Sequence, residues 1–390
     1  MKIFKLKDIS EFIRNGVTIK QDISSKEGIP ITRIETISKG TIDFNKLGYA
    51  NIFKIEKYKE WLLKKGDILI SHINSEKHLG KSAIYLDNNY DIIHGMNLLC
   101  IRVIGKKVFP EYLQLFFKTN QYKKQIKKIT KKSVNQASFS VNDFKEILIT
   151  VPDLNIQEKI IKKIKVLEKI LENNKLKLDY LSELTKSLFT RMFGDIRTNS
   201  KNWETKKIDE CILNNIENIN LKINGEIAYI DISSINNKEN KIFSYKIYNN
   251  INEAPSRAKK ILNEGDILIS TVRPNLKNIA ILNNKILPLT IGSTGFCVLR
   301  FKDIINNKYI FEIIKSDNFT EMLVKKQIGA NYPAISDRDI KLIEIPVPPI
   351  ELQNKFAERV EKIEKLSFEI EKSIKEAENL YNSLINKYFD

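Results

Sequence analysis

The sequence lacks the features of several large protein classes. Its 390 residues contain three cysteines, Cys100, Cys211 and Cys297, which lie far apart and show no CxxC spacing. This spacing favours buried thiols in a reducing compartment over a disulfide framework or a zinc site. No run approaches the roughly 18 apolar residues of a membrane-spanning helix. Because the first residues also lack the apolar core of a signal peptide, we expect a cytoplasmic protein with no membrane partner.

Catalytic motifs are missing as well. The chain has no G-x-x-x-x-G-K-[ST] phosphate loop and no G-x-G-x-x-G dinucleotide loop. No Asn-Pro-Pro or Asp-Pro-Pro precedes an aromatic residue, so the usual amino-methyltransferase pocket is absent. The three histidines, His72, His78 and His94, show neither a standard zinc spacing nor an HExxH motif. We therefore predict no catalytic residue, no metal site and no cofactor in this chain.

Positive charge is in excess. Lysine and arginine number 65 against 48 acidic residues, which gives a net charge of +17, and 42% of the residues are hydrophobic. This apolar fraction is sufficient for folded cores. The charge predicts a polyanionic partner, with nucleic acid as the first hypothesis. A lysine-rich surface is often only a solvated one, so the charge alone leaves the partner open.

The strongest positive feature is an internal repeat. The hexapeptide Gly66–Ser71 recurs without change as Gly265–Ser270, an offset of 199 residues (66 to 265). Near the end of each half, Val151–Gln157 corresponds to Val347–Gln353, an offset of 196 residues (151 to 347). Ordered blocks at nearly constant offset indicate that the chain contains two copies of one unit of about 196 residues.

Each copy begins with a β-rich part of about 150 residues. Short apolar runs broken by turn residues predict strands, and longer stretches between them predict helices. The expected strands are Ile68–Ile73, Ala83–Leu86, Leu98–Val103, Ile227–Ile232, Ile267–Val272 and Phe296–Phe301, and the expected helical stretches are Glu111–Lys128 and Lys308–Lys326. The first part of each copy is therefore expected to be a mixed α/β unit.

Each copy ends in one long helix with a coiled-coil seam. Apolar residues recur at alternating steps of four and three residues after a proline, over about five heptads. The seam positions are Ile160, Ile164, Leu167, Leu171, Asn174, Leu178, Leu181, Thr185, Leu188 and Met192 in the first helix, and Phe356, Val360, Ile363, Ser367, Ile370, Ile374, Ala377, Tyr381, Leu384 and Tyr388 in the second. Asn174 and Ser367 either fix the register or are simply tolerated. A single helix cannot bury such a stripe, so we expect the two to pack on each other.

These elements predict a mixed α/β fold with two tandem units. The expected boundaries are 1–154 and 195–349 for the α/β units, and 155–194 and 350–390 for the long helices. We expect the helices to run antiparallel, with the α/β units at opposite ends of a pseudo-twofold dumbbell. Such an architecture suits the binding of two DNA segments at a distance that the helices set.

Candidate DNA-binding residues come from two polar, turn-rich loops that occur at matching positions in both copies. One loop follows the Gly-Asp strand, and the other precedes a Ser-x-x-Asp turn. The candidates are His72, Asn74, Lys77, His78, Lys81, Lys131, Lys132, Ser133, Asn135, Gln136 and Ser138 in the first copy, and Thr271, Arg273, Asn275, Lys277, Gln327, Asn331 and Tyr332 in the second. For each residue taken alone, a role in forming the turn is an equally good explanation.

The chain resembles the specificity subunit of type I restriction-modification systems. The resemblance rests on Gly-Asp-Ile-Leu-Ile-Ser in both halves and on Ile345–Gln353 before the second helix, with a weaker copy at Thr150–Glu158 before the first. It covers the whole chain. The first copy departs from the pattern, because Asp153 replaces the second proline and Gln157 precedes Glu158.

The resemblance implies a non-catalytic subunit with two target recognition domains and two spacer helices. It implies a bipartite double-stranded DNA target and two modification subunits, which bind S-adenosylmethionine and methylate adenine at N6. It also implies restriction subunits that use ATP and Mg²⁺. The competing hypotheses are a stand-alone nuclease or fused methyltransferase, and a coiled-coil scaffold that binds protein or membrane.

Overall fold

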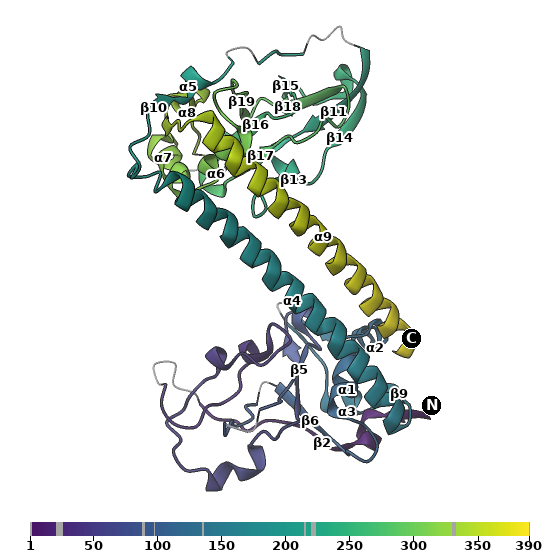
Figure 1. Ribbon diagram of the computed structural model, residues 1–390. Helices are drawn as coiled ribbons and strands as arrows, with labels where there is room; N and C mark the ends of the chain where they lie inside the picture. Colours follow the sequence, from purple (N-terminus) through teal and green to yellow (C-terminus); the bar gives the residue numbers. More distant parts are fainter. Residues whose placement is uncertain are drawn as a thin grey trace. The chain divides into compact units, whose positions relative to one another are not determined.

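The computed structural model describes residues 2–20, 26–87, 90–96, 98–134, 136–213, 216–219, 224–329 and 333–389. The chain divides into two compact units. Unit 1 contains Met1–Lys175 and Lys372–Asp390, and unit 2 contains Leu176–Glu371. Both boundaries fall inside the two longest helices, α4 (Leu154–Phe193) and α9 (Ile350–Phe389), drawn in teal and yellow in Figure 1. Each unit therefore contains a segment of both long helices.

The central sheet of unit 1 contains the first Gly-Asp strand. Its order is β2-β6-β3-β5, with antiparallel neighbours throughout. The strands are β2 (Ser10–Asn15), β3 (Ile68–Ser71), β5 (Ser82–Ile84) and β6 (Leu98–Val103). Ile68 and Ile70 of β3 enter one hydrophobic core, whereas Leu69 enters another on the opposite face. This burial on both faces explains why the strand is apolar without alternation.

Unit 2 repeats this arrangement with the second Gly-Asp strand. A sheet of order β17-β16-β19 and a sheet of order β14-β11-β18-β15 form its β-rich part. The strands are β11 (Asn224–Ile230), β14 (Lys246–Asn250), β15 (Ala258–Ile261), β16 (Ile267–Ser270), β17 (Ile279–Ile281), β18 (Leu289–Ser293) and β19 (Phe296–Leu299). Ile267 and Ile269 enter one core and Leu268 another, as in unit 1.

The β14-β11-β18-β15 sheet of unit 2 has a counterpart in unit 1 that consists of single bridges. Isolated bridges join Ile31 to Gly48 in antiparallel and to Ile93 in parallel orientation, and Leu62 to Ile93 in antiparallel orientation. In unit 2 the strand β11 pairs antiparallel with β14 and parallel with β18, and β15 pairs antiparallel with β18. The two units therefore share one topology, although their residues in this region differ.

Each predicted helical stretch is divided in two by a side-chain cap. The stretch expected at Glu111–Lys128 forms α1 (Pro110–Phe116) and α2 (Asn120–Ile129), and Thr119 accepts a hydrogen bond from the Tyr122 N–H. In unit 2 the corresponding helices are α6 (Asn307–Ile314) and α7 (Asp317–Lys326), where Ser316 plays the same part. A hydroxyl that caps a new first turn competes with continuation of the preceding helix, which explains the division.

The smaller elements also occur in pairs. Strand β1 (Lys2–Lys5) pairs with β9 (Leu148–Val151), and β10 (Thr205–Lys207) pairs with β20 (Glu344–Pro346), both antiparallel. The remaining short helices are α3 (Val141–Lys145), α5 (Ile208–Cys211) and α8 (Asp337–Lys341). The three cysteines are free and buried, which confirms that they are buried thiols.

In each unit, the segments of α4 and α9 run in opposite directions. In unit 1, the start of α4 at Ile164 shares a core with the end of α9 at Phe389. In unit 2, the end of α4 at Phe193 shares a core with the start of α9 at Phe356. The predicted mixed α/β fold with paired long helices is confirmed.

The structure places the twelve apolar residues proposed for the seam on the inner face of the helices. Buried residues are Ile160, Ile164, Leu167, Phe356 and Val360, and half-buried residues are Leu171, Leu178, Leu181, Ile363, Ile370, Ile374 and Leu384. The polar seam positions differ from each other: Asn174 donates to Ser373 on α9 (3.1 Å), whereas Ser367 donates to Ile363 in its own helix (3.0 Å). Of the two, only Asn174 links the helices.

A buried glutamine joins the start of α4 to the rest of unit 1. The Gln157 side chain is fully buried. Its Oε1 accepts from the Phe109 N–H (2.9 Å), and its Nε2 donates to the carbonyls of Pro152 (2.7 Å) and Lys107 (3.1 Å). One amide thus binds three main-chain groups, two just before α1 and one just after β9.

In unit 2, Gln353 forms the same three hydrogen bonds at the start of α9, and we call each set of three bonds a glutamine joint. Gln353 is fully buried, accepts from the Asn306 N–H (2.8 Å), and donates to the carbonyls of Pro348 (2.7 Å) and Ile304 (3.1 Å). The chemical match of all three bonds shows that the repeat preserves this joint and not only its sequence.

Replacement of either glutamine by alanine should destabilise the chain. Gln157→Ala or Gln353→Ala leaves one N–H and two carbonyls without their side-chain partner, one of these carbonyls in a buried place, so we expect a loss of about 2–4 kcal/mol in the free energy of unfolding. Urea denaturation measures it. Glu358→Ala, at an exposed position of α9, is the control and should change the free energy by less than about 0.5 kcal/mol. Equal effects of all three substitutions would contradict the role of the joint.

Candidate nucleic-acid interface

In unit 1, the two candidate loops form one small sheet. Strand β4 (Ile73–Asn74) follows the Gly-Asp strand, and β7 (Lys131–Lys132) and β8 (Ala137–Ser138) belong to the second loop. Their order is β4-β8-β7, so that Asn74 lies opposite Ala137 and Lys132 lies opposite the same residue on the other side. The sheet thus brings together polar residues that lie far apart in the sequence.

Unit 2 brings the corresponding loops together in the same way. Ala334 forms antiparallel bridges with Val272 after β16 and with Ile328 after α7. The Arg273 N–H donates to the Pro333 carbonyl (2.7 Å), and the Ile335 N–H donates to the Thr271 carbonyl (2.9 Å). The same pairing in two units with different loop residues indicates a common frame on which variable side chains are presented.

Local hydrogen bonds determine the form of these loops. In unit 1, both the N–H and the hydroxyl of Ser133 donate to the Gln136 carbonyl, at 2.8 and 2.9 Å. In unit 2, Arg273 and Lys277 adopt left-handed conformations on either side of the short helix Pro274–Leu276. Ser270 at the end of β16 donates to the Val272 carbonyl (2.8 Å), which holds the chain at the start of this turn.

Most candidate residues lie on the surface. Lys77, Lys131, Lys132, Ser133, Gln136, Arg273 and Asn275 are exposed, and Asn74, His78, Lys81, Ser138, Thr271, Lys277 and Gln327 are half-buried. Asn135, Asn331 and Tyr332 lie outside the described residues. Two of the lysines form ion pairs, Lys132 with Glu76 (2.9 Å) and Lys277 with Asp317. These bonds lower the pKa of Glu76 and that of Asp317, so both carboxylates stay ionised beside the loops.

His72 does not belong to this surface. Its side chain is 4% exposed and packs against Phe139, with ring centroids 6.3 Å apart. Burial lowers its pKa to about 4, so the imidazole is neutral at pH 7. His94 is buried as well and donates to the Leu98 carbonyl (2.8 Å), with a pKa lowered to about 4, chiefly by burial.

A third segment, which the sequence did not reveal, lies beside the interface of unit 2. The turn 237–240 lies between β12 (Ile235–Asn236) and β13 (Lys241–Ile242). Its Asn237 Nδ2 donates to the Leu276 carbonyl (2.9 Å), and its Asn240 Nδ2 donates to the Lys277 carbonyl (3.3 Å). The asparagine-rich run indicates a turn, but only the tertiary structure shows that this turn supports the Arg273 loop.

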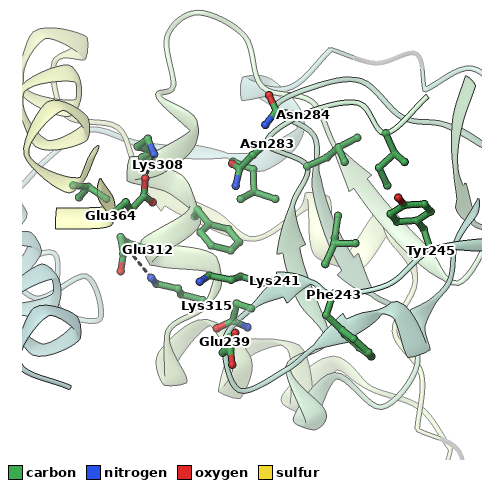
Figure 2. A pocket seen from close by; sticks show the side chains of 17 residues that line it. Glu239, Lys241, Phe243, Tyr245, Asn283, Asn284, Lys308, Glu312, Lys315 and Glu364 are labelled. Atoms are coloured by element: carbon green, nitrogen blue, oxygen red, sulfur yellow. Dashed lines mark hydrogen bonds and ion pairs between the residues drawn. The ribbon is translucent and has the colours of Figure 1, made fainter. Parts of the chain in front are cut away.

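A cavity of about 470 Å³ lies on unit 2 between the β12–β13 hairpin, α6 and α9 (Figure 2), and Asn240 of the same turn is among its lining residues. Four of its charged side chains form two pairs: Lys308 contacts Glu364, and Lys315 lies 2.6 Å from Glu312. Phe243 and Tyr245 line the same cavity. In these two pairs the lysine and the carboxylate neutralise each other. Among the described residues, no group of three His, Cys, Asp or Glu side chains could hold a metal ion.

The family described as Type I restriction modification DNA specificity domain matches the chain twice, at residues 1–180 and 200–378. A putative type I restriction enzyme specificity subunit of Methanocaldococcus jannaschii, MjaX, is 33% identical over 96% of this chain and 89% of its own length. The chain belongs to the type I restriction-modification specificity family. The role of this chain is therefore DNA specificity, which is not a catalytic role.

Solved structures from type I restriction-modification systems share the fold. The S subunit of a type I system from M. genitalium is 14% identical, covers 100% of this chain and 96% of its own, and superposes with a TM-score of 0.59. A structure described as showing complex assembly and conformational transition of the type I system covers 99% of this chain and 97% of its own, with 15% identity and a TM-score of 0.51. No helix in the described part of this family member is long and apolar enough to cross a membrane.

Unit 1 of this specificity-family chain should be more sensitive to acid than unit 2. His72 and His94 have pKa values of about 4 when folded and about 6.5 when unfolded, and unit 2 contains no histidine. Above about pH 6.5 both histidines are neutral in the folded and in the unfolded state, and the stability is fully present. As the pH falls toward 4, the unfolded chain binds protons that the folded chain does not, so the free energy of unfolding decreases by up to about 3 kcal/mol per histidine.

Hydrogen exchange detected by mass spectrometry tests this difference at about pH 5 and about pH 7, after correction for the intrinsic exchange rates. The β3 and β6 amides should lose protection at the lower pH, whereas the β16 and β19 amides should keep it. His72→Leu, which removes one titrating group, should reduce the difference. Equal loss of protection in both units would contradict the prediction.

Proposed function

We propose that this chain reads a bipartite double-stranded DNA target, with one half-site for each α/β unit. The proposed target recognition domains are residues 1–154 and 195–349. The observation that carries the proposal is the shared frame: both units bring the same two polar loops together and present different side chains on them. A common frame with different exposed residues suits the recognition of two different sequences.

The long helices, assigned to residues 155–194 and 350–390, are proposed to set the spacing of the half-sites. Each helix has 40 residues and is therefore about 60 Å long. We further propose that two modification subunits dock on their outer faces. Exposed apolar residues on these faces support this, since a solvated helix rarely presents so many: Val166, Ile170, Tyr180, Leu184, Leu366 and Phe368.

The partners would supply all of the catalysis, in the cytoplasm. Modification subunits with S-adenosylmethionine methylate adenine at N6, and restriction subunits with ATP and Mg²⁺ cleave unmethylated DNA. The relatives are named as subunits of type I restriction enzymes, which supports an assembly of this kind.

Mapping of methylated adenines tests the function directly. The chain, reconstituted with the modification subunits of its own system, should methylate one bipartite sequence in genomic DNA when S-adenosylmethionine is present. The purified chain alone should neither methylate nor cleave DNA in S-adenosylmethionine and Mg²⁺. Turnover by the isolated chain would favour the enzyme hypothesis, and methylation without any sequence preference would overturn the specificity role.

Arg273→Ala should affect one half-site only. Arg273 is exposed in the loop after β16, and a lost arginine contact to a base or phosphate costs about 1–3 kcal/mol, or about 10- to 100-fold in affinity. Footprints with duplexes mutated in one half-site at a time measure the effect. Gln136→Ala in unit 1 is the reciprocal variant and should affect the other half-site. A loss shared equally by both half-sites would contradict the assignment of one half-site to each unit.

A further inference from the structure

Helix α2 of unit 1 and the strand that follows it carry six exposed lysines. We define the lysine face as the six exposed side chains Lys123, Lys124, Lys127, Lys128, Lys131 and Lys132, on α2 and the adjoining strand β7. Tyr122 and Ile126 on the opposite side of the helix are buried. The four helical lysines form two i, i+4 pairs, so they project from one broad side of α2.

Helix α2 is joined to the candidate interface by contacts on its buried side. The Tyr122 hydroxyl donates to the Gly80 carbonyl (3.1 Å), and a Cβ added at Gly80 would lie 3.2 Å from Ile126 Cγ1. The loop that carries Lys77 and His78 therefore packs directly on α2. The charge of Lys127 also contributes, after the larger effect of Lys132, to the lowered pKa of Glu76 in that loop. Lys132 and Lys127 therefore lie near the loop that carries Lys77 and His78.

The charges of the lysine face have few partners within the chain. In the ranges that the structure describes, Lys132 is the one member with a carboxylate within 4 Å, namely that of Glu76 at 2.9 Å. Like charges four residues apart on a helix destabilise it slightly. An arrangement of this kind is unfavourable for the free protein and becomes favourable when an extended polyanion binds to it.

The corresponding helix of unit 2 lacks this surface. Helix α7 matches α2 in length, in its hydroxyl N-cap and in its buried residues Phe319 and Leu323. At the positions that match the six lysines stand Thr320, Glu321, Val324, Lys325, Ile328 and Gly329, an offset of 197 residues (119 to 316 at the N-cap). The frame is duplicated, but the lysine face occurs in one copy only.

We propose that the lysine face binds the DNA backbone phosphates beside the half-site of unit 1 and supplies a large part of the salt-dependent affinity of the whole chain. This inference rests on the proposed function and deepens it. Lysines that neutralise phosphates release condensed counterions, and the contact carries no base information. The two units therefore have different roles, because unit 1 contributes more to holding the duplex while both units read its sequence.

The salt dependence of DNA binding tests the proposal. The test variant carries Lys123→Gln, Lys124→Gln, Lys127→Gln and Lys128→Gln, since glutamine keeps helix propensity and removes the charge. The matched control removes four exposed lysines from the segment that precedes β3, by Lys54→Gln, Lys59→Gln, Lys64→Gln and Lys65→Gln. Both are assembled with the modification subunits, and the affinity for an unmethylated duplex of the mapped target sequence is measured over a range of KCl concentrations.

The slope of log K against log [KCl] should fall in magnitude by about 0.9 for each lost phosphate contact, hence by about 3 to 4 in the test variant and by less than about 1 in the control. The methylated sequence should not change in either variant. Equal slopes in the two variants would overturn the inference. If the quadruple variant fails to assemble, Lys127→Gln with Lys128→Gln should still lower the slope by about 2.

Two further outcomes are distinguished by the same experiment. If the wild-type complex methylates no bipartite target, the proposed function fails, independently of any slope. If the test variant keeps the wild-type slope on DNA but no longer binds phosphatidylserine vesicles that the wild-type complex binds, the lysine face recognises a lipid surface and the inference is wrong.

Discussion

The fold depends on one buried amide at the start of each long helix. The Gln157 and Gln353 side chains each bind one N–H and two carbonyls, and a buried polar group of this kind has to keep all of its partners. The geometry fixes both where the helix begins and how it is rotated about its axis. Because the rotation is fixed, the apolar stripe of the helix faces the neighbouring helix, and the adjacent apolar residues face the core of the unit.

The ends of the long helices are held by aromatic contacts. Phe389 packs on Tyr112 in unit 1 with ring centroids 4.8 Å apart, and Phe193 packs on Tyr309 in unit 2 at 4.6 Å. Each unit therefore holds the start of one long helix by a glutamine and the end of the other by a phenylalanine. These glutamine and phenylalanine contacts do not involve the exposed loops, so loop residues can change without disturbing the helices.

The strands and long helices that a local pattern or a repeat determines could be predicted from the sequence. Two identical hexapeptides located β3 and β16, and the heptad spacing located α4 and α9. The sequence could not predict that His72 turns inward, because the residue follows a buried strand and its direction depends on the packing of Phe139. The support of the Arg273 loop by Asn240 was equally hidden, since hydrogen bonds between residues far apart leave no periodic signal.

The two copies share their frame but differ in electrostatics. The ion pair of Asp67 with Arg102 recurs as that of Asp266 with Arg300, at 2.7 and 2.8 Å, so the interior of the repeat is kept. At the surface, Lys124 of α2 is replaced by Glu321 in α7. A net charge of +17 is thus not spread evenly over a duplicated structure. Since phosphate contacts are indifferent to sequence, a unit that carries more of them can change its reading loops and still hold DNA.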